Sequence, residues 1–259
     1  AVEVVFEQGI THTSNTLFTP SKVSDVFFFD GKPGFKAEYF TNKELQGEPK
    51  VVQTETRVSR FWQEGVEMAP GVFAKNSSIR WTTTFVPDKD GEYVFELGGD
   101  DGFRMKIDGK ICIESWNNQN NAPEKYRFVA QKGQKYEVVI EYYQGDGGAR
   151  IRFTTGNEVV TDLDQLVANV KDADVIVFVG GLTPMLEGEE MPVNIEGFNG
   201  GDRTSINLPK IQTDLLKALH KTGKPVVFVM MTGSALACEW EAKNIPAIVN
   251  AWYGGQSAG

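Results

Sequence analysis

Cysteine is scarce in this sequence: the 259 residues include two, Cys112 and Cys238. No Cys-x-x-Cys pair is present, which excludes a zinc site of that type and favours two separate buried thiols over a disulfide. No run approaches the roughly 18 apolar residues of a membrane-spanning helix, so no membrane span is predicted. Gly180-Gly181 lacks the Gly-x-Gly-x-x-Gly spacing, which disfavours a dinucleotide-binding fold.

Positive charge is in deficit, with 26 Lys and Arg against 35 Asp and Glu, a net charge of −9. That balance argues against nucleic acid as a partner. Hydrophobic residues make up 41% and charged ones 24%, as is usual for a soluble globular protein. No signal peptide is visible before the strand-like AVEVVFEQG, and the sequence stops just after an apolar run. We therefore expect the chain to be cut from a longer one.

The middle of the chain alternates short apolar runs with glycine-containing turns such as Asp90-Gly91 and Asp108-Gly109. Many short strands between such turns indicate an antiparallel sandwich or barrel. The predicted strands are Phe35–Phe40, Ser78–Phe85, Glu92–Leu97, Phe103–Ile107, Tyr126–Val129, Tyr136–Tyr142 and Ala149–Phe153.

After Asn157 the pattern changes to alternating strands and helices. Continuous apolar runs at 175–179 and 226–231 predict buried strands, the first of them led by Asp174, and 245–251 looks like a third strand. Before the first run, 163–170 keeps helical spacing behind an Asp162 N-cap, and between the first two runs a second helix opens at Leu208-Pro209. Strand–helix–strand order with short connections predicts a parallel sheet, whose following loops share one edge.

The predicted fold class is therefore mixed: a discontinuous α/β sandwich interrupted by an all-β sandwich. The expected domains are residues 1–33 and 155–259 for the α/β part and 34–154 for the insert. A strand over residues 1–9 is assigned to the α/β sheet, because it has no other partner. The loops at 181–203, 232–236 and 252–257 should meet at the carboxyl edge of that sheet.

The first of these loops is dense in carboxylates, including Glu187, Glu189 and Glu190. A carboxyl close to other carboxyls has a raised pKa and can act as a general acid. Glycoside hydrolysis needs two carboxyls that flank the scissile bond. A solvated acidic loop is the alternative interpretation, and the spacing alone does not decide between them.

The segments ADVIVFVGGLTPMLEGEEM, GFNGGDRTSINLPKIQTDLLKAL, TGKPVVFVMMTGSALACEW and IPAIVNAWYGGQSAG resemble, in this order, the C-terminal α/β sandwich domain of family 3 glycoside hydrolases. The resemblance implies a retaining β-glucosidase- or β-xylosidase-like enzyme. Its nucleophile would be an Asp on a preceding TIM-like barrel, absent here, and its acid/base a Glu on the acidic loop. That residue corresponds to Glu189, with Glu187 and Glu190 as alternatives. Asp202, Arg203 and Trp252 are the candidate substrate-binding residues.

Residues 34–154 resemble a PA14 domain in the segments GFKAEYF, SIRWTTTFVPDKDGEYVFELGGDDGFRMKIDGK and ESWNN. Such domains interrupt the α/β sandwich of some family 3 enzymes and are thought to limit substrate length. In related adhesins an Asp-Asp pair, helped by an Asn, binds calcium and a sugar. Asp100-Asp101 matches the pair, with Asn117, Asn118 and Asn120 as candidates for the third ligand.

Three hypotheses follow. In the first, the chain is part of a family 3 β-glycosidase that needs no cofactor and acts on an oligosaccharide or glycoside. Its partner is the barrel of the same polypeptide, and without that barrel the chain is inactive. In the second, it is a carbohydrate-binding or adhesion module, with calcium at Asp100 and Asp101. In the third, it is a scaffold with no site of its own.

Overall fold

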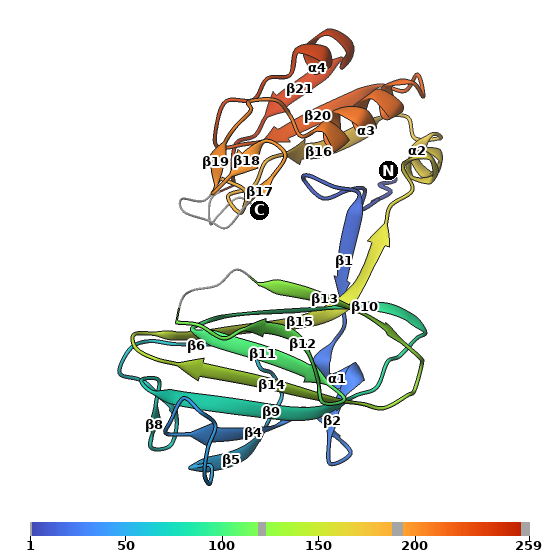
Figure 1. The fold of residues 1–259 in the computed structure, drawn as a ribbon. Helices are drawn as coiled ribbons and strands as arrows, with labels where there is room; N and C mark the ends of the chain where they lie inside the picture. Colours follow the sequence, from blue (N-terminus) through green and yellow to red (C-terminus); the bar gives the residue numbers. More distant parts are fainter. Residues whose placement is uncertain (1, 119–122, 188–193, 255–259) are drawn as a thin grey trace. The chain divides into compact units, whose positions relative to one another are not determined.

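The computed structural model describes residues 2–118, 123–187 and 194–254 of the chain (Figure 1). The chain divides into two compact units. Phe18–Glu158 form a β unit, and Ala1–Leu17 together with Val159–Gly259 form an α/β unit. A mixed fold with an α/β sheet and an antiparallel β-sandwich, as predicted from the sequence, is confirmed.

The β unit contains a five-stranded and an eight-stranded sheet. The first has the order β1-β15-β10-β13, with β6 also paired to β15; the second has the order β12-β11-β14-β9-β2-β3, with β4 on β9 and β5 on β4. Their bounds are β1 Thr16–Pro20, β2 Phe27–Phe29, β3 Lys32–Pro33, β4 Phe35–Phe40, β5 Val51–Glu55, β6 Arg60–Trp62, β9 Ser77–Phe85, β10 Gly91–Asp100, β11 Gly102–Ile107, β12 Lys110–Ser115, β13 Glu124–Ala130, β14 Tyr136–Gln144 and β15 Ala149–Val160. Helix α1, Val23–Val26, and the hairpin of β7, Glu67–Ala69, with β8, Val72–Phe73, complete the unit.

The core of the β unit is aromatic. Strand β9 alternates buried and half-buried side chains, so that Ile79, Trp81 and Phe85 point inward, as period-two patterning requires. Phe27 and Phe95 pack beside Phe85, with ring centroids 5.4 and 5.2 Å away. Edge-to-face and tilted contacts of this kind add to the free energy of burial.

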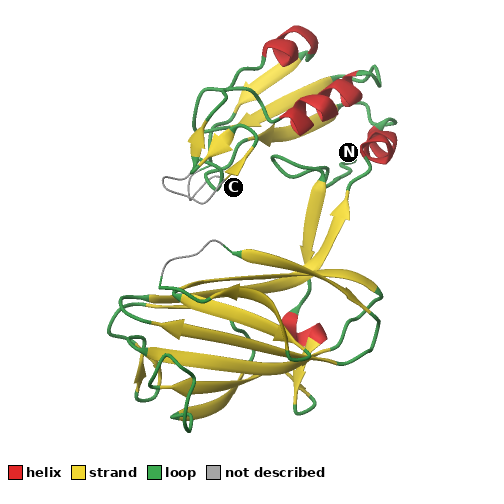
Figure 2. Ribbon diagram, in the orientation of Figure 1, coloured by secondary structure: helices red, strands yellow, loops and turns green. Residues whose placement is uncertain are grey.

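The α/β unit is built on a three-stranded parallel sheet of order β16-β20-β21 (Figure 2). Its strands are β16 Ile176–Gly181, β20 Val226–Met231 and β21 Ala247–Asn250, and its helices are α2 Leu163–Val170, α3 Lys210–His220 and α4 Glu239–Asn244. Short strands β17 Asn194–Ile195, β18 Phe198–Asn199 and β19 Asp202–Arg203 form a separate small sheet. The carboxylate of Asp162 accepts from two backbone N–H groups at the start of α2, which confirms the predicted N-cap.

Helices pack on one face of the parallel sheet, and the described residues place none on the other. Phe228 on β20 is fully buried in a cluster with Leu216 of α3 and Leu166 of α2. On the opposite face Val177 and Val179 of β16 are 59% and 63% exposed. A parallel sheet is normally covered on both faces, so this aliphatic face lacks a cover among the described residues. None of the helices within the described ranges has the length and apolar character that crossing a membrane would demand.

Two expectations from the sequence differ from the structure. Residues 2–9 form no strand, and Val2, Val4 and Phe6 are 90%, 84% and 84% exposed. An extended segment is a strand only when another strand pairs with it, and no described strand does so here. The boundary of the β unit lies at Phe18 rather than residue 34, because Val26 and Phe27 are fully buried in its core.

Candidate functional site

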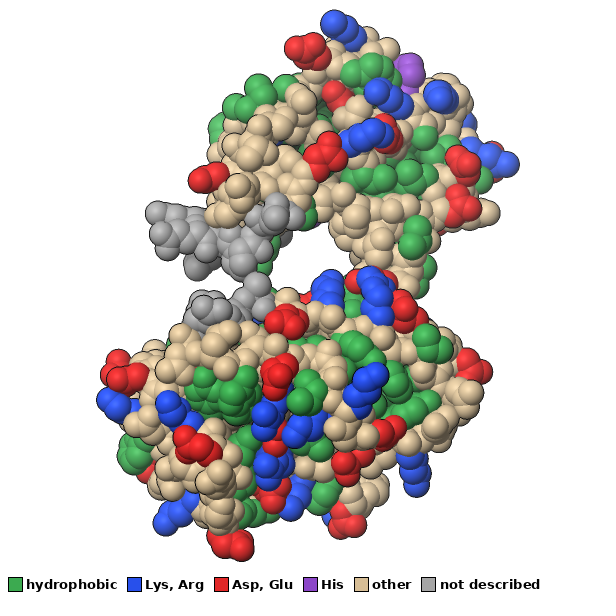
Figure 3. Space-filling view, in the orientation of Figure 1, with side chains coloured by type: hydrophobic (Ala, Val, Ile, Leu, Met, Phe, Trp, Pro, Cys, Tyr) green, Lys and Arg blue, Asp and Glu red, His purple; other side chains and the backbone are tan. Residues whose placement is uncertain are grey.

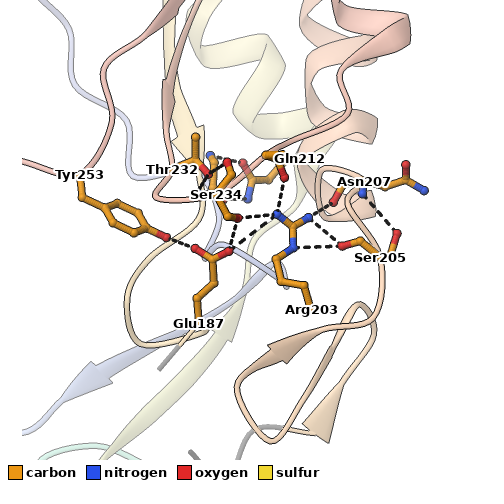
Figure 4. A network of polar contacts seen from close by, with 10 residues as sticks. Glu187, Arg203, Ser205, Asn207, Gln212, Thr232, Ser234 and Tyr253 are labelled. Carbon is orange, nitrogen blue, oxygen red and sulfur yellow. Dashed lines mark hydrogen bonds and ion pairs between the residues drawn. The ribbon is translucent and has the colours of Figure 1, made fainter. Parts of the chain in front are cut away.

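The loops that follow the three parallel strands meet at the carboxyl edge of the sheet. Glu187 comes after β16, Ser234 after β20 and Tyr253 after β21 (Figure 4). The Ser234 hydroxyl donates to Oε1 of Glu187, and the Tyr253 hydroxyl donates to Oε2. Direct hydrogen bonds between these loops therefore confirm the prediction that they share an edge.

Arg203 is the cation of this network. Its Nη1 lies 3.7 Å from Oε1 of Glu187, and both side chains are 12% exposed. The same Nη1 donates to the Ser234 hydroxyl at 3.0 Å and to the Ala235 carbonyl at 2.8 Å. Nε and Nη2 donate to the Ser205 carbonyl at 3.0 and 2.7 Å. Arg203 thus joins the loop after β20 to the segment that leads into α3.

A buried glutamine fixes the point where the acidic loop leaves the sheet. Gln212, 1% exposed, accepts from the Gly181 N–H at 2.6 Å and donates to the Gly181 carbonyl at 2.7 Å. Gly181 has a φ of 117°, and a Cβ there would lie 2.0 Å from the carbonyl oxygen of Met231. Only glycine fits this conformation and this close approach.

Tyr253 is a hydrogen-bond donor to Glu187. Burial, the hydrogen bond to Glu187 and the negative charge of Glu187 raise the pKa of Tyr253 to about 12. The phenol therefore stays protonated at any physiological pH and keeps its hydrogen bond to the carboxylate.

The predicted site residues separate in the structure. Glu187 and Arg203 belong to one network, whereas Glu189 and Glu190 lie outside the described residues. Asp202 is exposed on β19, and Trp252 is 58% exposed beside Tyr253. The sequence did not identify Ser234 as a partner of Glu187, or Gln212 as a partner of Gly181. The signals that could have indicated them are the position of Ser234 just after a parallel strand and that of Gln212 in the first turn of α3, the helix that follows the acidic loop.

A second group of polar residues lies in the β unit, around the predicted Asp-Asp pair. Asp101, 8% exposed, accepts from the Gly145 N–H at 2.7 Å. Asn118 accepts from the Tyr143 hydroxyl at 2.7 Å, and both Asp101 and Asn118 border Gly145. Burial and the charge of Asp101 raise the pKa of Asp100, against the opposite effect of Arg150.

These oxygens are of the kind that calcium prefers, but calcium takes six to eight of them. Among the described residues no group of three or more His, Cys, Asp or Glu side chains could hold a metal ion. Of the candidate amides, Asn118 borders the same glycine as Asp101, and Asn120 lies outside the described residues. A calcium ion here would therefore need ligands beyond Asp100, Asp101 and Asn118.

Comparison with known proteins shows which family the chain belongs to. The family profile described as "PA14 domain" matches residues 31–165, just over half of the chain. The chain belongs to the PA14 domain family. The match covers almost the whole β unit, so Asp100 and Asp101 are residues of a PA14 domain.

The matches to curated relatives cover the α/β unit as well as the PA14 domain. The chain is 35% identical to a xylan 1,4-beta-xylosidase of Xylanibacter ruminicola over 99% of its own length, and 29% identical to beta-glucosidase B of Emericella nidulans over all of it. It spans 30% and 31% of those proteins. The crystal structure of a beta-glucosidase from Kluyveromyces marxianus shares the fold, with a TM-score of 0.62 over 93% of this chain, 31% of that chain and 21% identity. The resemblance to family 3 β-glycosidases with a PA14 insert is confirmed.

Proposed function

We propose that the chain is the second domain, with its PA14 insert, of a retaining family 3 β-glycosidase. The longer protein would remove terminal β-linked sugars from oligosaccharides or glycosides, with its nucleophilic Asp on a barrel outside this chain. One observation carries the proposal: the acidic loop begins at the carboxyl edge of a parallel sheet, where ligands bind in open α/β folds, and its first Glu is tied to the loops after both other strands.

The general acid/base in this proposal is Glu189, two residues after Glu187. Both oxygens of Glu187 already accept a hydroxyl proton, from Ser234 and from Tyr253. A general acid must instead offer a proton to the leaving group within hydrogen-bond reach. This occupancy favours Glu189, the residue that the family resemblance indicates, over Glu187; Glu190 remains the alternative.

The experiment compares the 259-residue chain with the longer polypeptide that includes the barrel. The chain alone should not hydrolyse 4-nitrophenyl β-xyloside or β-glucoside, because the proposed nucleophile lies on the barrel. In the longer polypeptide, Glu189→Gln should slow hydrolysis of a substrate with a poor leaving group by roughly 10²- to 10⁴-fold, the usual contribution of general acid catalysis. Glu190→Gln is the matched control. Hydrolysis by the chain alone that Glu189→Gln removes would contradict the proposal.

The rest of the polypeptide is also the proposed cover for the aliphatic sheet face around Val177 and Val179. In the longer protein this face should exchange backbone hydrogen more slowly than in the 259-residue chain. Equal exchange rates in the two proteins would mean that the face has no partner there.

A second candidate function is sugar binding by the PA14 domain. The pair Asp100-Asp101 supports it, with Asn118 bordering the same glycine as Asp101, since carboxylate and amide oxygens suit calcium. Glucose or xylose with calcium should then raise the melting temperature of the β unit, and Asp101→Ala should abolish the increase. Asp146→Ala, which removes an exposed carboxylate on the turn after β14, is the control. No increase with either sugar, with or without calcium, counts against this function.

A further inference from the structure

Glu187 and Arg203 stand at the two ends of the acidic loop, and one hydroxyl connects them. The Ser234 Oγ donates to Glu187 and accepts from Arg203 at 3.0 Å. Tyr253 adds a second donor to Glu187. We call Glu187, Arg203, Ser234 and Tyr253 the loop clamp (Figure 4).

The clamp joins elements that are distant in the sequence. Ser234 and Tyr253 belong to loops after β20 and β21, whose strands pair in parallel register with each other. Arg203 also donates to the carbonyls of Ser205 and Asn207, just before α3. Each end of the acidic loop is therefore fixed to the sheet edge rather than to solvent-exposed chain.

Within the clamp Glu187 accepts hydrogen bonds, and the other three side chains donate them. Tyr253 keeps its proton because its pKa lies at about 12, and the Arg203 guanidinium is always charged. Glu187 faces two hydroxyl donors and this cation with a side chain that is 12% exposed. A carboxylate in this setting is an anchor for other groups.

We propose that the loop clamp positions the catalytic loop of the glycosidase, with Glu187 as a positioning residue rather than the acid/base. The inference rests on the proposed function. Catalytic groups need placement within a fraction of an ångström, and a loop anchored at both ends loses less entropy when it is placed. The clamp supplies both anchors.

The first test uses the 259-residue chain and needs no activity. Hydrogen exchange in peptides that cover residues 203–207 should be at least several-fold faster in Glu187→Gln and in Tyr253→Phe than in the wild type. Exchange in α3 should not change. Thr204→Ala, which removes an exposed hydroxyl beside Arg203, is the matched control. Unchanged exchange at 203–207 in both variants would overturn the clamp.

The second test uses the longer polypeptide and separates positioning from proton transfer. Glu187→Gln and Tyr253→Phe should each lower kcat by roughly 10- to 100-fold, the loss expected for hydrogen bonds to a charged group, for activated and unactivated leaving groups alike. Both should keep the alkaline limb of the pH profile and gain nothing from added azide. Because Tyr253 acts through Glu187, the double variant should be little worse than Glu187→Gln alone.

The outcomes are distinguishable. If Glu187→Gln spares 2,4-dinitrophenyl glycosides, loses the alkaline limb and is rescued by azide, Glu187 is the acid/base and the clamp assignment is wrong while the glycosidase stands. If the longer polypeptide hydrolyses no glycoside, the proposed function fails, and hydrogen exchange still decides whether the clamp holds the loop ends. Should Glu187→Gln not fold, Ser234→Ala and Tyr253→Phe each remove one donor and carry the same tests.

Discussion

Glu141 is a buried charged residue whose removal should lower the stability of the β unit. It lies on β14 with a side chain that is 3% exposed, and three cations from the neighbouring strands surround it. Arg80 on β9 donates at 2.8 Å, and Arg104 and Lys106 on β11 donate at 2.5 and 3.0 Å. Figure 3 shows basic and acidic side chains interspersed on one face of the β unit.

The size of the effect follows from the pKa of Glu141. Burial raises it, but the hydrogen bonds from Arg104, Arg80 and Lys106 outweigh burial and lower it from 4.5 to about 2. A folded-state pKa below the unfolded one stabilises the protein above the unfolded pKa, and the stability is lost as the pH falls toward 2. The difference corresponds to about 3 kcal/mol at pH 7, and about 1 kcal/mol remains at pH 3.

Glu141→Gln should therefore lower the free energy of unfolding by about 3 kcal/mol at pH 7 but by only about 1 kcal/mol at pH 3. The assay is urea unfolding followed by tryptophan fluorescence, because Trp81 is fully buried in the same unit. Glu137→Gln, an exposed carboxylate on the same strand, should change little at either pH. An equal loss at pH 7 and pH 3, or a loss in Glu137→Gln of the same size, would refute this electrostatic account.

Four further substitutions test the α/β unit by calorimetry. Gly181→Ala should lower its melting temperature markedly, since the new Cβ would lie 2.0 Å from the Met231 carbonyl oxygen; an unchanged temperature would mean that the turn relaxes. Phe228→Ala leaves a buried cavity and should lower the free energy of unfolding by about 3–5 kcal/mol. Val177 is 59% exposed, so Val177→Ala should lower it by under about 1 kcal/mol; equal losses would contradict the assignment of the two faces. Asp162→Ala should cost about 1 kcal/mol, the usual value of an N-cap, and a neutral result would show that the cap is not used.

The secondary structure of the α/β unit could be predicted because its signals are local. The run from Val226 to Met231 is continuously apolar and rich in valine, and β20 occupies the same residues. Asp162 precedes an apolar face at helical spacing, and α2 begins at Leu163. Residues 2–9 carry an equally good strand pattern, but a strand depends on its neighbour, and pairing is not a property of the segment itself.

The candidate site was predictable in location but not in its contacts. The order of strands and helices predicts that the loops after β16, β20 and β21 share an edge. Acidic residues on the first loop were evident, but Ser234 as a hydrogen-bond donor to Glu187 was not, because a serine after a strand has many uses. The sequence separation of 47 residues between them is closed only by the parallel register of β16 and β20.

The same reasoning explains how an α/β unit tolerates an insertion as large as residues 18–158. The two points where the chain leaves and re-enters the α/β unit are hydrogen-bonded to each other: Asn15 Nδ2 donates to the Thr161 carbonyl at 3.1 Å, and the Thr161 N–H donates to the Asn15 carbonyl at 2.7 Å. Within the β unit, the Ser21 N–H donates to the Thr155 carbonyl at 2.9 Å. Because both units hold their own ends together, the insertion adds little loop-closure entropy to either, and the sheet that carries Glu187 can form as though the chain were continuous.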